Sequence, residues 1–147
     1  VELVLAMRTN IRLTVDVDPH ETIVTAPLRV VRILVNLFKN ARDALNTCPD
    51  AWLEVRLVSA DDDAVVLQIV DGGPGIPGHS RDAVFRHGFT TKSSGSGFGL
   101  HASATSAREL GGTLTLATSQ PGEGARFQLE LPRCAPGKRV DVLSPIT

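Results

Sequence analysis

The sequence lacks any long apolar run, and its net charge is close to zero. No stretch approaches the ~20 apolar residues that a membrane-spanning helix needs, and no signal peptide is visible. A formal net charge of −1 at pH 7 gives no reason to expect binding to nucleic acid or to an anionic membrane. We therefore expect no nucleic-acid partner and no direct membrane contact from this chain.

Cysteine is also scarce. Cys48 and Cys134 are the only two among 147 residues, and they lack the close spacing that is typical of a metal site. A reducing, cytoplasmic setting is the simplest interpretation of so few cysteines. The chain begins with valine rather than methionine, so we expect a fragment of a longer protein whose absent segments hold any membrane attachment.

The length fits one compact domain, and the apolar periodicity predicts strands mixed with helices. The expected elements are a short helix over 1–8, strands over 11–17 and 22–25, a long helix from Pro27 to Leu45, strands over 51–59 and 64–71, helical turns over 81–86, a helix from Gly97 to Leu110, and strands over 113–119 and 125–132. Short links between neighbouring strands favour antiparallel pairing. We predict an α+β fold: a two-layer α/β sandwich with a mostly antiparallel mixed sheet and helices on one face. The domain should span 1–132, with a loose tail over 133–147.

The long helix has two stripes of different character. Its buried face is predicted from apolar residues at spacings of three and four, namely Leu28, Val31, Leu34, Phe38, Ala41 and Leu45. Asn36, Asn40 and Asp43 form a second stripe, roughly opposite the first. Asparagine is a mediocre helix former, so two on one stripe need a reason. The stripe is either a solvated face or a row of ligands for a polyphosphate and its Mg²⁺, which prefers oxygen.

Asp71 ends the apolar strand VLQIVD. Alternation along the strand places it on the same face as Val65, Leu67 and Ile69. A carboxylate that continues an apolar row is partly desolvated and needs a hydrogen-bond donor, which the exocyclic amino group of a base could supply. Asp-Gly is also a strong turn signal, so a simple turn remains the alternative.

The segment FTTKSSGSGFGLH, Phe89 to His101, sets a lysine before three alternating glycines. The glycine N–H groups can approach a ligand closely, at a predicted helix N-terminus that favours anions. The residues concerned are Gly95, Gly97 and Gly99, together with Thr90, Thr91 and Lys92. A flexible linker before a helix has the same composition, so both interpretations stay open. A loop of this kind can also order over a bound nucleotide as a lid.

Taken in order, these segments resemble the boxes of the GHKL superfamily, which includes sensor histidine kinases, gyrase B, mismatch-repair ATPases and a heat-shock chaperone. NLFKNARDAL is similar to the N box, DGGPGIP to the first glycine box, VFRHGFTTK to the phenylalanine box and GSGFGLH to the second glycine box. GEGARFQLELP resembles the last hairpin. The resemblance spans residues 11–132 and implies an ATP-binding fold of the Bergerat type.

The resemblance also implies a set of contacts to ATP and Mg²⁺. Asn40 would bind magnesium, and Asp71 would accept the adenine amino hydrogen. Gly73 and Gly75 would let the base approach, with Ile76 against it. The lysine and the N–H groups of the second glycine box would wrap the phosphates. The ATP-binding candidates are Asn36, Asn40, Asp43, Asp71, Gly73, Gly75, Ile76, Thr90, Thr91, Lys92, Gly95, Ser96, Gly97, Phe98, Gly99, Leu100 and His101.

Asn36 indicates which branch of the superfamily is present. The resemblance implies that hydrolases have a glutamate at this place, and a neutral amide is not a useful base at pH 7. The implied function is the catalytic domain of a two-component sensor histidine kinase, with Asn36 and Asn40 catalytic. It would transfer the γ-phosphoryl group of Mg-ATP to a histidine elsewhere. The alternatives are another GHKL kinase, such as an anti-sigma-type serine kinase, and a non-catalytic nucleotide-binding regulatory module.

The acceptor histidine is expected outside this chain. His20 lies between predicted strands rather than on a helix that could dimerise, so the dimerisation and acceptor domain is expected upstream of Val1. The further implied partner is a response regulator, and the full-length protein is expected to be a homodimer. Asp43, Ala44 and Arg126 depart from the family pattern. Arg126 stands where a small hydroxyl residue often helps to hold the adenine.

Overall fold

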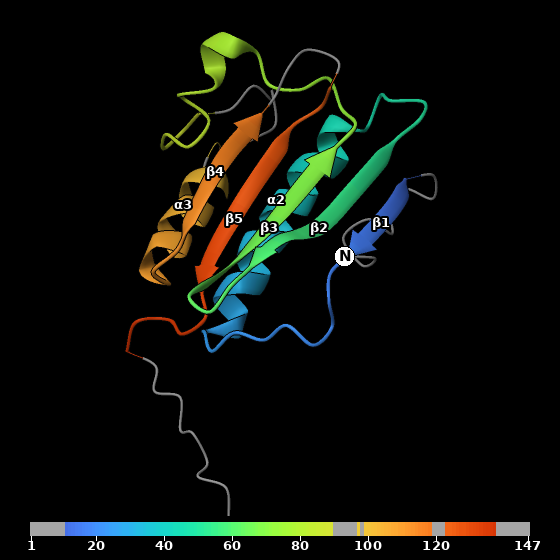
Figure 1. Ribbon diagram of the computed structural model, residues 1–147. Helices are drawn as coiled ribbons and strands as arrows, with labels where there is room; N and C mark the ends of the chain where they lie inside the picture. The colour runs from blue at the N-terminus through green and yellow to red at the C-terminus, as the bar shows by residue number, and fades with distance from the viewer. Residues whose placement is uncertain (1–10, 90–96, 98, 119–122, 138–147) are drawn as a thin grey trace, which may run out of the picture.

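The computed structural model describes residues 11–89, 97, 99–118 and 123–137. Its elements are β1 (Arg12–Asp16), α2 (Pro27–Ala44), β2 (Trp52–Ala60), β3 (Ala64–Asp71), the 3₁₀ helix η1 (Gly78–Ser80), α3 (Gly99–Glu109), β4 (Thr113–Thr118) and β5 (Arg126–Pro132). The strands form one sheet in the order β1-β2-β3-β5-β4, in which only β1 and β2 are parallel neighbours. Both α-helices lie against one face of this sheet (Figure 1). The predicted two-layer sandwich with a mostly antiparallel mixed sheet is confirmed.

The hairpin between β2 and β3 is closed by its acidic turn. The Asp61 carboxylate accepts hydrogen bonds from the backbone N–H groups of Asp63 and Ala64, at 2.9 and 2.8 Å. These bonds lower the pKa of Asp61 below its ordinary value. A short polar side chain that bonds its own backbone is the usual reason for aspartate in turns. The turn predicted at Asp61–Asp63 is therefore confirmed.

The buried face of α2 differs from the prediction only in the first turns, since Phe38, Ala41 and Leu45 are buried as predicted. Its core row runs at intervals of four through Ile33, Leu37 and Ala41 and continues to Leu45 just past the helix. Leu28 and Val31, which the sequence places on the buried face, are 81% and 53% exposed. The first turns of α2 have apolar residues on nearly every side. Two different apolar rows could therefore face the sheet, and the sequence does not distinguish them. The longer row of every fourth residue packs on the sheet.

Helix α3 ends as the sequence predicts. Gly111 adopts a positive φ of 81°, which glycine alone adopts readily, and Gly112 donates a backbone bond to Ala107. Ala107 and Leu110 are buried in the core. This termination sends the chain directly into β4, so that α3 lies beside the strand at one end of the sheet (Figure 1).

Two short predicted elements are wrong. The strand expected over 22–25 is a single bridge between Val24 and Cys134, because Pro27 starts α2 too soon for a ladder to form. The helical turns expected over 81–86 are successive tight turns with bonds three residues back, such as Arg86 N–H to Ala83 O. The short helix expected over 1–8 lies outside the described residues.

The start of the predicted loose tail contacts the domain. The Arg133 guanidinium pairs with Glu21, and its backbone N–H donates to Asp63 O at 2.8 Å. Ala135 is 5% exposed. Residues 138–147 lie outside the described part of the chain, so the domain boundary at 132 stays a prediction. Among the described residues, no helix has the length and apolarity that crossing a bilayer requires.

Candidate functional site

Asn36, the first residue of the predicted asparagine stripe, lies on the flank of α2 that faces α3. The Asn36 side-chain amide donates to Ser103 Oγ at 3.1 Å and to Gly99 O at 3.4 Å. Asn36 and Asn40 are both half-buried. The N box therefore meets the second glycine box, 63 residues further along the chain. A purely solvated face is excluded for Asn36, and the N-terminus of α3 is held beside it.

Asp71 is buried at the end of β3, with 4% of its surface exposed. Its Oδ1 accepts hydrogen bonds from the backbone N–H groups of Gly73 at 3.0 Å and Ala125 at 3.4 Å. Burial raises the pKa of the Asp71 carboxyl above its ordinary value, and these two bonds lower it by less. Within the described residues, Oδ2 accepts no hydrogen bond. The predicted desolvation is confirmed, and Oδ2 is available to a donor from a ligand.

The glycines at positions 73 and 124 lie so close to Asp71 that neither position has room for a side chain. A Cβ at Gly73 would lie 2.8 Å from Asp71 Oδ1 and 3.1 Å from the Cβ of Ala44. A Cβ at Gly124 would lie 1.6 Å from Asp71 O. Gly75 has a positive φ of 78°, and Ile76 packs against the core. The first glycine box therefore keeps the approach to the carboxylate open, as a base-binding site requires.

The phosphate-loop candidates are only partly described. Gly88 N–H donates to Gly97 O at 3.2 Å, and a Cβ at Gly97 would lie 2.4 Å from the carbonyl carbon of Gly88. This contact joins the two ends of the lid segment. The candidates Thr90, Thr91, Lys92, Gly95, Ser96 and Phe98 lie outside the described residues, so their roles stay predictions.

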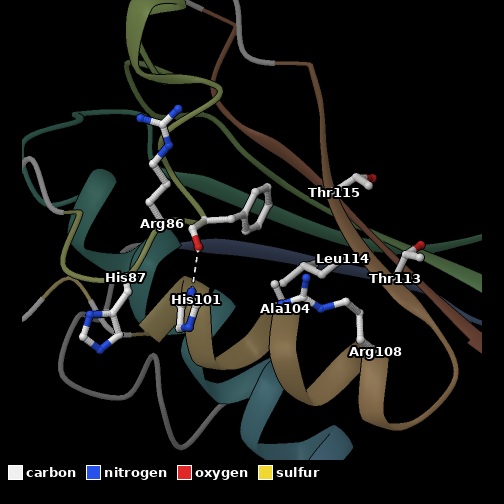
Figure 2. A pocket seen from close by; sticks show the side chains of 9 residues that line it. Arg86, His87, His101, Ala104, Arg108, Thr113, Leu114 and Thr115 are labelled. Atoms are coloured by element: carbon white, nitrogen blue, oxygen red, sulfur yellow. Dashed lines mark hydrogen bonds between the residues drawn. The ribbon is translucent and has the colours of Figure 1, made fainter.

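His101 lies on a different side of α3 from the asparagine stripe. Its Nδ1 is 3.0 Å from Phe85 O, and its ring stacks edge-on with His87 at 5.2 Å between centroids. It lines a hollow of about 600 Å³ between α3, β4 and residues 85–87 (Figure 2). This hollow contains neither Asn36 nor Asp71. Leu100 packs against the core. The structure thus brings Asn36 and Gly99 together but turns His101 elsewhere.

Two residues near the candidate site were missed by sequence reasoning. Ser103, at 2% exposed, holds Asn36, and its place one turn after Gly99 on α3 was the available signal. Ala125 is joined to Asp71 by two hydrogen bonds: its N–H donates to Asp71 Oδ1, and its carbonyl accepts from the Asp71 backbone N–H. Arg126 pairs with Val70, whose side chain lies on the opposite face of the sheet.

The donor set suits magnesium bound mainly by phosphate oxygens. The described residues contain no group of three or more His, Cys, Asp and Glu side chains that could hold a metal ion. Mg²⁺ usually takes only one or two protein ligands and completes its shell with phosphates and water. A single amide oxygen from Asn40 fits that pattern. Asp43 instead contacts its neighbour Arg42 at 3.2 Å and is 40% exposed.

Comparisons with known proteins agree with this geometry. A family model described as histidine kinase-, DNA gyrase B- and HSP90-like ATPase matches residues 25–135. The sensor protein FixL of Bradyrhizobium diazoefficiens is 32% identical over 128 residues, which are 86% of this chain and 25% of FixL. The chain therefore spans about a quarter of the length of this curated relative.

Solved structures show the same arrangement of helices and strands. The mycobacterial sensor histidine kinase MprB superposes with a TM-score of 0.76 and 29% identity, covering 89% of each chain. Full-length ShkA in complex with AMPPNP gives a TM-score of 0.70 and 25% identity, covering 86% of this chain and 26% of ShkA. The chain belongs to the histidine kinase-, DNA gyrase B- and HSP90-like ATPase family, as an ATPase domain of the sensor histidine kinase type.

Proposed function

We propose that this domain binds Mg-ATP and transfers the γ-phosphoryl group to a histidine on a separate dimerisation domain. The observation that supports nucleotide binding best is Asp71, a buried carboxylate whose Oδ1 accepts two hydrogen bonds and whose Oδ2 accepts none from a described residue. The amino group of adenine is a donor of the right kind, and it would pair with the carboxylate oxygen that no described residue bonds. The AMPPNP in the ShkA complex is consistent with an adenine nucleotide as ligand.

The phosphates would lie at the start of α3. The first N–H groups of a helix have no intrahelical partner, and the helix dipole favours an anion there. Asn36 fixes this end of α3 through its bonds to Gly99 and Ser103. Lys92 would add a positive charge from the lid segment. Asn40 would hold Mg²⁺, which neutralises charge on the phosphates when bound.

The transfer step uses a nucleophile from outside the domain. A neutral imidazole nitrogen forms a bond to the γ-phosphorus as the bond to the β–γ bridging oxygen breaks, ADP leaves, and the imidazole proton goes to solvent. Asn36 cannot take a proton from water at pH 7, and its amide nitrogen is already bonded to α3. The domain thus works by positioning and by charge neutralisation, and little hydrolysis is expected from it alone.

Other readings of the site have less support. The relatives reported above are the sensor protein FixL, the sensor histidine kinase MprB and ShkA. None of them supports a serine kinase or a regulatory module. For the whole protein we propose a cytoplasmic location of this domain, a homodimer formed through the acceptor domain, and a response regulator as the next phosphoryl acceptor. These proposals follow from the kinase assignment.

Calorimetry with the 147-residue chain tests the proposal. AMPPNP and ADP should bind with measurable heat, more tightly when Mg²⁺ is added, and ATP should be hydrolysed at no more than a trace rate. An absence of both heat and thermal shift at millimolar nucleotide would favour the regulatory module. Steady phosphate release over many turnovers would instead show that the domain is a self-contained hydrolase.

A further inference from the structure

Among the described residues, none pairs with the outer edge of β4. β4 ends the strand order and makes no backbone hydrogen bond to any described residue outside its partner β5. Residues 113–117, TLTLA, include neither a charge nor a proline, whereas β1 at the opposite edge has Arg12 and Asp16. Charges and prolines are the usual means by which an edge strand avoids pairing. Their absence from β4 suits an edge that is used for binding.

Two adjoining hollows follow this edge. The first, of about 600 Å³, lies beside Thr113 to Thr115, and the second, of about 400 Å³, continues to Ala117. They share Phe85, Leu114 and Thr115, and we call the combined trough the β4 groove. Five strand residues extend over roughly 13 Å between their first and last Cα atoms. A trough of that length fits an extended peptide better than a compact small molecule.

Basic side chains surround the β4 groove. They are Arg81, Arg86, His87, His101 and Arg108, against a single carboxylate, that of Asp82. The Arg86 side chain makes no hydrogen bond or ion pair with a described residue, and Arg108 bonds only Thr105 Oγ1, at 3.3 Å. Figure 2 shows that Arg86 lies on the loop that follows Phe85 and that Arg108 lies on α3. A guanidinium without a carboxylate partner is well suited to bind one from a ligand.

The floor of the β4 groove is apolar and firmly packed. Leu114 is 7% exposed, and Phe85 packs edge-on against Phe127 of the core with 6.3 Å between ring centroids. Ala104 completes the wall on α3. An apolar floor beneath a basic rim fits a segment that combines apolar and acidic residues.

We propose that the β4 groove binds an extended acidic segment of a partner protein, which adds to the sheet as a strand beside β4. One of its apolar side chains would rest on Phe85 and Leu114, and its carboxylates would pair with Arg86 and Arg108. Backbone bonds to a free edge supply affinity in this mode, and the alternate side chains supply specificity. The groove lies on the side of α3 away from Asn36, so the inference does not rest on the nucleotide proposal.

A peptide titration tests this binding. The probe is a fluorescein-labelled octapeptide, Glu-Thr-Val-Thr-Glu-Thr-Val-Thr, which places glutamate and valine on the same face of a strand. A peptide with lysine in place of glutamate serves as the control probe. We expect saturable binding of the acidic peptide alone. The double variant Arg86→Glu/Arg108→Glu should weaken it by about tenfold or more, since two partly exposed charges are reversed. The matched variant Arg12→Glu/Arg32→Glu changes the net charge equally at exposed sites outside the groove and should have little effect.

Backbone methylation of the peptide separates strand addition from simple charge attraction. Methylating one alternate set of peptide nitrogens should abolish binding, and methylating the other set should not, because only one set faces β4. Unchanged thermal unfolding of both double variants confirms that they are folded. The proposal is overturned if the acidic peptide fails to bind at millimolar concentration, if both methylated peptides bind alike, or if the two double variants lose affinity equally.

Discussion

The side-chain amide of Asn36 on α2 donates a hydrogen bond of 3.1 Å to the hydroxyl of Ser103 on α3. This bond joins the two helices that flank the proposed phosphate site. Asn36, which the family resemblance implies is catalytic, therefore also contributes to the packing between α2 and α3.

Ser103→Ala should lower the free energy of unfolding by about 1–2 kcal/mol, because the half-buried amide of Asn36 keeps only its longer bond to Gly99. Thermal or urea unfolding measures this change. Ser106→Ala is the matched control on the same helix, since Ser106 makes no side-chain bond to a described residue. Equal losses in the two variants would show that the Asn36 bond contributes nothing.

Asp71→Asn should weaken ADP binding by roughly tenfold to a hundredfold, as expected when a hydrogen bond to a charged acceptor is lost. The amide can still accept from Gly73 and Ala125, but it then presents a donor to the adenine amino group. Calorimetry measures the affinity, with Asp50→Asn at an exposed position as the control. Unchanged affinity in the Asp71 variant would refute the adenine assignment.

The raised pKa of Asp71 predicts two opposite effects of pH. The folded state favours the protonated carboxyl, so its contribution to stability is full below the ordinary value of 3.8 and is lost as pH rises through the raised pKa. ADP affinity should rise over the same interval, because the charged carboxylate is the better acceptor. Unfolding and binding are measured across this interval, and Asp71→Asn should remove both dependences.

Gly73→Ala should reduce ADP affinity by about tenfold or more and stability by about 1–3 kcal/mol, because its Cβ would meet Asp71 Oδ1 at 2.8 Å. Gly78→Ala is the control, since a Cβ there has nothing within 4 Å and the backbone φ is negative. Calorimetry and thermal unfolding give both readouts. If alanine at 73 leaves binding intact, the base does not approach along this side of Asp71.

Asn40→Ala should remove most of the gain in ADP affinity that Mg²⁺ provides, a loss of at least about tenfold if the amide is a metal ligand. Affinity without Mg²⁺ should change little. Titrations with Mg²⁺ and with a chelator separate the two quantities, and Asn46→Ala at an exposed position is the control. An undiminished Mg²⁺ effect would remove Asn40 from the metal site.

Local patterns in the sequence predicted much of the fold. The alternation in β2 and β3, the aspartate turn between them, and the glycine that ends α3 are each determined by neighbours in the chain. The burial of Asp71 followed from the same alternation. Features that depend on a few adjacent residues are therefore open to prediction without a structure.

Features set by distant contacts were not predicted. The phase of α2 depends on which apolar row meets the sheet, and its first turns offered two. The partner of Asn36 lies 67 residues away on α3. The backbone N–H of Ala125 reaches Asp71 from a residue 54 positions further along the chain. Only the packed tertiary structure decides such questions.

The contact between Gly88 and Gly97 makes the lid segment a suitable place for insertions. Its two ends are already joined by a backbone bond of 3.2 Å, so added residues would lengthen a loop whose anchor points are fixed. Each doubling of loop length costs only about 0.6 kcal/mol in closure entropy. A short tag or a fluorescent reporter placed between these glycines should therefore leave the sheet and both helices folded.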